Sequence, residues 1–161
     1  MLPNLFLAGF PKAGTTSLFS WLAAHPEVCS ARPKEPGHFL PLRWGDPLPP
    51  PDYARNFTHA RSERWRLDGT PGHAYGGGAI AEAIREASPD ARVILLLRDP
   101  IGRAFSYYRY RQSQGRLMGV DFGDYVERCL ALSEAELRRR ENQDLFGVAG
   151  GCYARWLSDW Q

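Results

Sequence analysis

The chain has 161 residues, a length typical of one domain with a substantial hydrophobic core. Its formal net charge of +2 at pH 7 gives no indication of nucleic acid binding. The three cysteines lack C-x-x-C spacing and the four histidines are scattered, so neither a disulfide framework nor a zinc site is expected. No stretch approaches the ~20 apolar residues of a membrane span. No signal peptide precedes the first predicted strand, and the cysteine usage fits a reducing compartment, so we expect a cytoplasmic protein.

The first elements are a strand, a tight turn and a helix in direct succession. Residues 5–10 are an apolar run and residues 14–24 have helical periodicity. The turn between them contains Lys12, one of only two lysines in a chain with 18 arginines. Because the helix amides and the positive end of the helix dipole point into such a turn, it predicts an anion-binding site. The alternative is a structural turn that binds nothing.

This turn differs from the Walker A pattern G-x-x-x-x-G-K-[ST]. Gly9 and Gly14 have the required spacing, but Thr15 occupies the position of the lysine, and Lys12 lies inside the loop. The loop is therefore a poor match to a nucleoside triphosphate site.

A short strand at residues 28–31 leads into a second segment with candidate chemistry, Lys34-Glu35-Pro36-Gly37-His38-Phe39. The carboxylate of Glu35 and the imidazole of His38 are both candidate general bases. Five prolines between residues 41 and 60 predict a long irregular loop, and loops of this length are often functional. Its aromatic rings could stack equally well on a sugar or on a polyketide ring, at Trp44, Tyr53 and Phe57.

The remaining pattern alternates strands and helices. The predicted elements are a strand near 66–71, a helix at 79–87, a strand at 92–97, a helix at 100–114, charged helices at 121–142 and a helix start at 150–160. The apolar run at 92–97 predicts a strand buried on both faces. The alternation indicates an α/β fold of three layers, with a central parallel sheet flanked by helices. Ligands bind beyond the carboxyl ends of such strands, so the candidate segments could share one cleft.

A second anion motif follows the strand at 92–97, with the sequence Arg98-Asp99-Pro100-Ile101-Gly102-Arg103-Ala104-Phe105-Ser106-Tyr107-Tyr108. Arg98 ends the strand and Ser106 lies about two turns into the following helix, so both could bind one anion. We expect three further arginines to form a solvated helix face, at Arg109, Arg111 and Arg116.

These segments together resemble the sulfotransferases that use 3′-phosphoadenosine 5′-phosphosulfate (PAPS), closest to the heparan-type and bacterial carbohydrate branch. The first turn resembles the 5′-phosphosulfate loop, and residues 98–108 meet each fixed position of the 3′-phosphate motif R-D-P-x-x-R-x-x-S-x-Y. Residues 34–39 resemble K-E-P-x-x-F, and residues 151–160 resemble G-x-Y-x-x-x-L-x-x-W. Thr70-Pro71 and Tyr75 resemble an S-P-x-Y element near the acceptor site, with threonine in place of serine and a longer spacing to tyrosine.

The resemblance implies a PAPS-dependent sulfotransferase with a carbohydrate, glycolipid or small-molecule acceptor and no metal. The implied catalytic residues are Lys12 and Glu35, with His38 as the rival base. The implied donor-binding residues are Lys12, Ala13, Gly14, Thr15, Thr16, Ser17, Arg98 and Ser106.

The resemblance also implies one sulfotransferase domain over residues 1–161 that lacks the C-terminal portion of the family domain. That portion normally closes over the 3′-phosphate, so we expect weak donor affinity and one of three consequences: aggregation, a homodimer or a mobile C-terminal end. Neither a nucleic acid partner nor stable membrane insertion is expected. Two alternatives stay open: a P-loop kinase or NTPase, in which Asp99 is a Walker B carboxylate, and a nucleotide-binding domain without catalysis.

Overall fold

The computed structural model describes residues 1–160, which form two compact units. Unit 1 comprises residues 1–97 and 156–160, and unit 2 comprises residues 98–155. The two units are described separately below. The prediction of a single domain stays a prediction.

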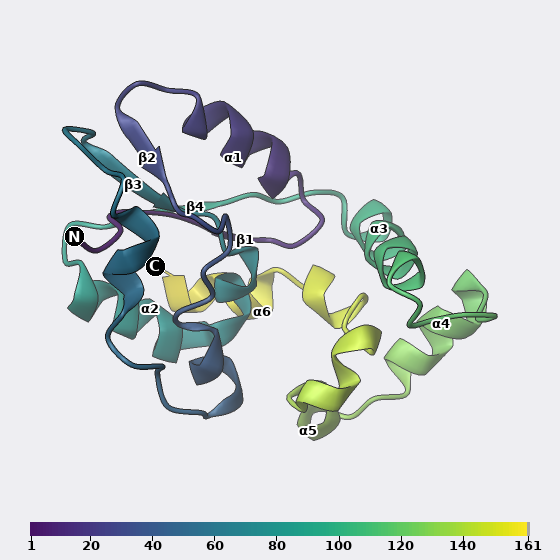
Figure 1. Ribbon diagram of the computed structural model, residues 1–161. Helices are drawn as coiled ribbons and strands as arrows, with labels where there is room; N and C mark the ends of the chain where they lie inside the picture. The colour runs from purple at the N-terminus through teal and green to yellow at the C-terminus, as the bar shows by residue number, and fades with distance from the viewer. Residues whose placement is uncertain (161) are drawn as a thin grey trace. The chain divides into compact units, whose positions relative to one another are not determined.

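Unit 1 is built on a four-stranded sheet in which every pairing is parallel (Figure 1). Its strands are β1 (Leu5–Gly9), β2 (Val28–Ser30), β3 (Trp65–Asp68) and β4 (Arg92–Leu95), in the spatial order β2-β3-β1-β4. Their positions agree with the predicted strands. Since all four strands run the same way, the loops that follow them begin at one edge of the sheet.

Helices α1 (Thr15–Ala23) and α2 (Gly77–Ala87) lie on opposite faces of the sheet, as Figure 1 shows. The sequence of β1 explains both contacts, because successive side chains of a strand point to opposite faces. Phe6 and Ala8 are in one core cluster with Ile80 and Ile84 of α2. Leu5 and Leu7 are in another, against which the predicted α1 stripe packs through Leu18, Phe19 and Leu22. The predicted three-layer α/β fold is confirmed.

The proline-rich segment after residue 40 is more ordered than predicted. It contains two 3₁₀ helices, η1 (Leu40–Trp44) and η2 (Tyr53–Phe57). The prediction that Tyr53 and Phe57 stack on an acceptor is wrong, because their side chains are only 4% and 3% exposed and belong to the α2-side core. Burial of large aromatic surface outweighs the irregular backbone that the prolines indicate.

Strand β4 is not buried on both faces, contrary to the prediction. It is the last strand in the order β2-β3-β1-β4, and 38% of Val93 is exposed. An apolar run indicates burial but does not say how many neighbours a strand has.

The segment 71–76 forms the 3₁₀ helix η3 (Pro71–Gly76), and the last described residues pack against it. The ring of Trp156 meets that of Tyr75 edge-on at 5.3 Å, and Trp160 Nε1 donates to the carbonyl oxygen of Ala74 at 3.4 Å. The single helix expected to start near residue 150 is instead three short elements: η5 (Ala149–Gly151), α6 (Ala154–Leu157) and η6 (Ser158–Trp160).

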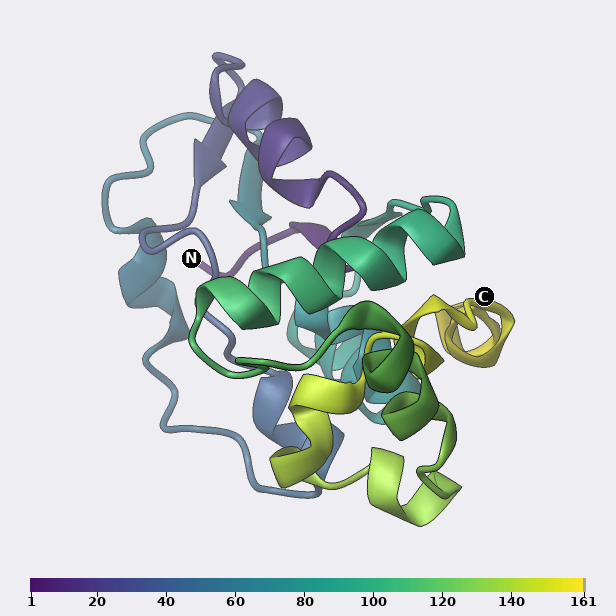
Figure 2. The same ribbon diagram turned by 90° about the vertical axis from the view of Figure 1, so that its right-hand side faces the viewer.

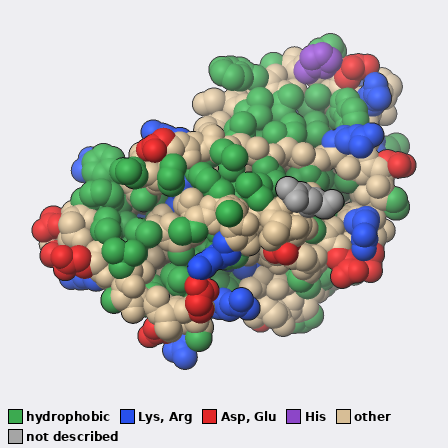
Figure 3. All heavy atoms as spheres, turned by 180° about the vertical axis from the view of Figure 1, so that it is seen from behind, with side chains coloured by type: hydrophobic (Ala, Val, Ile, Leu, Met, Phe, Trp, Pro, Cys, Tyr) green, Lys and Arg blue, Asp and Glu red, His purple; other side chains and the backbone are tan. Residues whose placement is uncertain are grey.

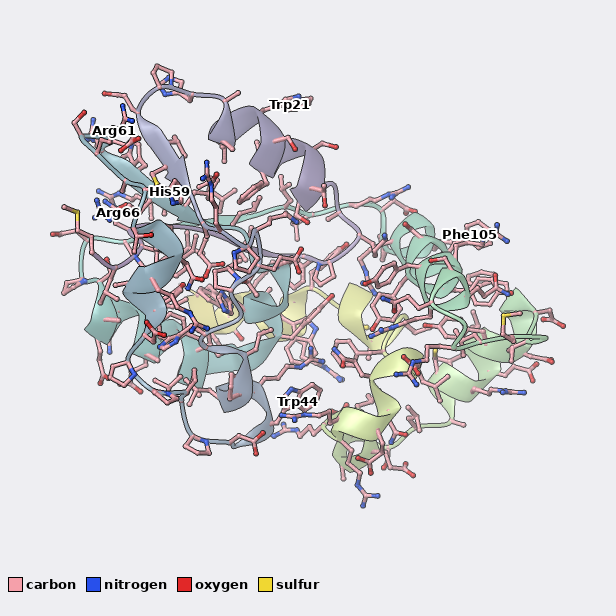
Figure 4. All side chains as sticks on the ribbon, in the orientation of Figure 1. Trp21, Trp44, His59, Arg61, Arg66 and Phe105 are labelled. Carbon is pink, nitrogen blue, oxygen red and sulfur yellow. The ribbon has the colours of Figure 1, made fainter. Side chains whose placement is uncertain are left out.

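Unit 2 is helical, and Figure 2 shows α3 (Pro100–Ser113) along its length. The other helices are α4 (Phe122–Leu130), α5 (Glu134–Leu137) and the 3₁₀ helix η4 (Arg140–Leu145). Its core contains the stacked or tilted rings of Tyr108, Phe122 and Tyr125. Figure 4 shows Phe105 on the outer side of α3, where 48% of its side chain is exposed.

Two arginines of α3, Arg103 and Arg111, connect this helix to other segments of unit 2. Arg103 is completely buried and donates from Nη2 to the carbonyl oxygen of Gly147.

The prediction that three arginines form a solvated helix face holds for Arg109 and Arg116, which are exposed, but is wrong for Arg111. That guanidinium pairs with Asp144 at 3.2 Å and donates to the hydroxyl of Tyr107 at 2.8 Å.

On the face shown in Figure 3, acidic and basic side chains are interspersed among hydrophobic ones, consistent with the small net charge. Within residues 1–160, no helix combines the length and the apolar character that crossing a membrane requires.

Gly9 is required by packing at the end of β1. A Cβ atom at this position would overlap the Cβ atom of Ala74 and lie 3.4 Å from the carbonyl oxygen of Pro71. We therefore expect Gly9→Ala to lower the free energy of unfolding by about 1–3 kcal/mol, as overpacking does. A matched control is Gly78→Ala in α2, where nothing lies within 4 Å of the new atom. That variant should be neutral or gain up to about 1 kcal/mol from helix propensity. Chemical denaturation measures both, and equal stabilities would contradict the packing argument.

The buried imidazole of His73 should make the stability of the fold depend on pH. It is completely buried beside the rings of Phe6 and Phe39, and neither ring nitrogen has a hydrogen-bond partner within residues 1–160. Burial lowers the pKa of His73. Below its unfolded pKa of about 6.5 the unfolded chain binds a proton that the folded chain does not, so stability falls as the pH falls. We expect His73→Leu to reduce this slope between pH 6.5 and 5 in denaturation measurements. An unchanged slope would show that the imidazole is not the responsible group.

Candidate active site

The loop after β1 has the features of an anion site. Gly14 is the N-cap of α1 with a φ of 96°, no side chain caps the helix, and no acidic residue lies in its first turn. The first amides of a helix have no partner within it, so those of Thr15, Thr16 and Ser17 point into the loop with the positive end of the dipole. This geometry suits a phosphate or sulfate group.

Lys12 and the hydroxyl groups differ in what they can contribute. Lys12 has a φ of 70°, a left-handed conformation that is uncommon outside glycine and that clusters at functional sites. Ala13 donates its amide to the carbonyl oxygen of Phe10 at 3.1 Å, which closes the turn. Thr16 and Ser17 are exposed, whereas the side chain of Thr15 is buried. Thr15 can therefore offer its amide to a ligand, but the accessible hydroxyls are those of Thr16 and Ser17.

Lys34, in the loop after β2, joins the two candidate segments of unit 1. Its Nζ lies 2.7 Å from Glu35 Oε1 and donates to Thr16 Oγ1 at 3.3 Å. The same ammonium lies 5.5 Å from the centre of the Phe19 ring in α1. The structure thus brings the candidate base Glu35 to the helix that carries the anion-binding amides. Sequence analysis gave Lys34 no role, although its rarity as one of two lysines was the signal.

Glu35 and His38 lie on the same loop in different surroundings. The side chain of Glu35 is half exposed. The ring of His38 stacks on that of Tyr53 at 4.3 Å and 8°, and burial lowers the pKa of His38. His38 is therefore neutral at pH 7, and its ring packs on the aromatic core. Glu35 is the more exposed of the two candidate bases.

The end of β3 supplies a third set of groups: Thr70, which the sequence placed in an element near the acceptor site, and Asp68, to which the sequence assigned no role. Asp68 and Thr70 are buried at 0% and 1% exposure. Asp68 accepts hydrogen bonds from the Tyr53 hydroxyl and the Thr70 amide, and Thr70 accepts one from the amide of Gly37. These contacts link β3 to the loop that carries Glu35. Arg61, which precedes β3 and is labelled in Figure 4, lies at the other edge of the sheet and is not part of this site.

In unit 2, the guanidinium of Arg98 and the side chain of Ser106 lie on the same face of α3. Arg98 Nε and Nη2 lie 3.8 Å from the position that a Cβ atom on Gly102 would take. Ser106 follows Gly102 by four residues and so lies on the same helix face. The hydroxyl of Tyr153 donates to the carbonyl oxygen of Arg98 at 2.9 Å and fixes its backbone.

Asp99 has a structural role that argues against a Walker B carboxylate. Its Oδ2 accepts a hydrogen bond from the Gly102 amide at 2.6 Å, which makes it the N-cap of α3. Within residues 1–160, no group of three or more His, Cys, Asp or Glu side chains is arranged to hold a metal ion.

Comparison with known proteins gives a consistent picture. No family model matches the chain. Human "Carbohydrate sulfotransferase 15" is 28% identical over 83% of this chain and 31% of its own length. The "Bifunctional heparan sulfate N-deacetylase/N-sulfotransferase" of Drosophila melanogaster is 23% identical over 99% of this chain and 16% of its own length. The chain thus spans less than a third of the length of these curated relatives.

A crystal structure of a sulfotransferase from Alicyclobacillus acidocaldarius superimposes with a TM-score of 0.79 at 24% identity. The match covers 99% of this chain and 68% of that one. The chain therefore has the sulfotransferase fold, and its sequence relatives make it a homologue of the carbohydrate and heparan sulfate sulfotransferases.

Proposed function

We propose that the protein transfers a sulfuryl group from PAPS to a hydroxyl or amine group of a carbohydrate. The observation that carries this proposal is the contact of Lys34 with both Glu35 and Thr16, because it brings a candidate base to a candidate anion site. The names of the relatives, which are carbohydrate and heparan sulfate sulfotransferases, support the acceptor class.

The donor supplies an activated sulfuryl group with a 3′,5′-diphosphate as its leaving group. The amides of Gly14, Thr15, Thr16 and Ser17 and the hydroxyls of Thr16 and Ser17 fit its 5′-phosphosulfate end. Lys12 contributes a positive charge in the same loop, where it can stabilise negative charge that develops on the leaving oxygen. Arg98 and Ser106 are assigned to the 3′-phosphate, since a guanidinium and a hydroxyl above one helix face suit a compact dianion.

Glu35 is proposed as the general base that accepts the proton of the acceptor group. Its carboxylate is half exposed and adjoins Lys34, whereas His38 is stacked on Tyr53. Sulfuryl transfer resembles phosphoryl transfer in having a loose transition state, so orientation and charge stabilisation contribute most of the catalysis. Both tasks fall to residues of the loops that follow β1 and β2.

The acceptor is proposed to contact the segment that follows residue 40. The guanidinium of Arg43 lies 4.4 Å from the centre of the Trp44 ring and 5.0 Å from that of Tyr75. Tyr75 in turn packs against Phe10, the residue that opens the anion loop, at 5.4 Å. Phe10 and Tyr75 are buried, so the partly exposed Arg43 and Trp44 are the side chains offered to a sugar ring that bears polar groups.

Donor specificity is tested by comparing 3′,5′-diphosphoadenosine with AMP in calorimetric titrations. Because Arg98 and Ser106 are assigned to the 3′-phosphate, the diphosphate should bind roughly tenfold to a thousandfold more tightly. Arg98→Ala should remove most of this preference, whereas Arg109→Ala, at an exposed position of the same helix, should retain it. Equal binding of the two nucleotides by the unmodified chain would refute the assignment.

The roles of Lys12 and Glu35 are separated by measuring donor binding and turnover in parallel. Glu35→Gln should leave diphosphate binding intact and lower kcat by roughly a hundredfold or more, as loss of a general base does. Lys12→Ala should weaken donor binding as well as turnover, because the ammonium lies in the anion loop. Turnover is measured as transfer of labelled sulfate from PAPS to N-desulfated heparan sulfate. Full activity of Glu35→Gln with loss of activity in His38→Ala would assign the base to His38.

A further inference from the structure

The loop that carries Glu35 is held by the end of β3 on both sides of the glutamate. The amide of Gly69 donates to the carbonyl oxygen of Lys34 at 3.2 Å, and the amide of Gly37 donates to Thr70 Oγ1 at 3.2 Å. The backbone position of Glu35 is thus determined by the residues that immediately follow β3.

Asp68, the last residue of β3, accepts a hydrogen bond on each of its carboxylate oxygens. It is completely buried, its Oδ1 accepts the Thr70 amide at 2.7 Å, and its Oδ2 accepts the hydroxyl of Tyr53. Burial and the neighbouring Asp68 raise the pKa of Tyr53, so this hydroxyl stays protonated and donates. One carboxylate therefore orients the threonine that binds Gly37 and the tyrosine that lies against His38.

The contact with His38 extends this arrangement to the far end of the loop. The rings of His38 and Tyr53 are nearly parallel, at 8°, and Phe39 meets Tyr53 edge-on at 5.5 Å. The two candidate bases, Glu35 and His38, are therefore both positioned from Asp68, one through Thr70 and the other through Tyr53.

Stability alone does not account for a carboxylate in this place. Transfer of a carboxylate from water into a protein core is unfavourable, and hydrogen bonds offset only part of the cost. The surroundings are apolar and aromatic, with Phe6, Phe39 and Tyr53 in the core cluster on this side of the sheet. A buried polar network in such a core specifies one arrangement of the groups that it joins.

We propose that Asp68 is a positioning residue for sulfuryl transfer, which acts through Thr70 and Tyr53 to fix the loop Lys34–Phe39 relative to the anion loop. This inference rests on the proposed function and adds residues to it. Asp68 does not touch the reacting atoms. Its effect is to keep Glu35 within reach of the acceptor proton, and small displacements of a base are costly in rate.

The test compares Thr70→Val with Thr70→Ser in the full chain. Valine has nearly the shape of threonine but cannot accept the hydrogen bond from Gly37, whereas serine can. Amide hydrogen exchange should show at least about tenfold faster exchange at Gly37 in Thr70→Val and no change at Leu7 in β1, which separates local release from unfolding.

The same two variants, Thr70→Val and Thr70→Ser, are also compared by their turnover. With PAPS and N-desulfated heparan sulfate, Thr70→Val should lower kcat by roughly ten- to a hundredfold at a nearly unchanged KM for PAPS. Thr70→Ser should stay close to the unmodified chain. Tyr53→Phe, which removes one donor to Asp68 and keeps the ring against His38, provides a second variant if Thr70→Val does not fold. It should lower kcat in the same direction.

The results distinguish this inference from the function on which it rests. Faster exchange at Gly37 with an unchanged kcat, or equal losses of kcat in the valine and serine variants, would overturn the positioning role while sulfuryl transfer stands. If Tyr53→Phe serves as the substitute, full turnover would overturn it as well. Absence of transfer by the unmodified chain would instead overturn the proposed function, and the positioning role of Asp68 with it.

Discussion

The parallel pairing of β1 with β3 on one side and β4 on the other determines where the chemical groups of unit 1 lie. Since β2 is also parallel to β3, the loops after β1, β2 and β3 begin at one edge of the sheet. These loops carry Lys12, Glu35 and Thr70. An antiparallel pairing of β2 would place Glu35 at the opposite edge from the amides of α1, and the contact between Lys34 and Thr16 could not form.

The same edge of the sheet contains buried polar side chains whose burial lowers the stability of the fold. Asp68, Thr70 and His73 are completely or almost completely buried among aromatic side chains. Locally unfavourable choices of this kind concentrate at functional sites, where position matters more than stability. Around Asp68 the cost is offset by hydrogen bonds to Tyr53 and Thr70. At His73 the ring stays neutral instead.

The sequence was informative where a local pattern determines the structure. The strands, α1, α3 and the turn between β1 and α1 follow from apolar periodicity and from the position of Gly14 at a helix start. The sequence was misleading where contacts between distant segments determine which residues are buried. The prolines before and after Leu48 indicated an exposed loop, yet Tyr53 is in the core, and the apolar run at 92–97 gave no sign that β4 has one neighbour. The contacts of Lys34 and Asp68 depend on which strands pair, and no local pattern reports that.

The two arginines of the R-D-P-x-x-R segment show why a motif match does not by itself assign roles. Arg98 lies over Gly102 at the start of α3, on the face that carries Ser106. Arg103, the residue directly after Gly102, is completely buried and binds the carbonyl oxygen of Gly147. The sequence pattern requires an arginine at both positions and does not distinguish them. The burial of Arg103 shows that its guanidinium binds the protein backbone, which leaves Arg98 as the candidate for a phosphate. The proposed anion binding by this segment is therefore assigned to Arg98, whereas the buried Arg103 joins α3 to the backbone of Gly147.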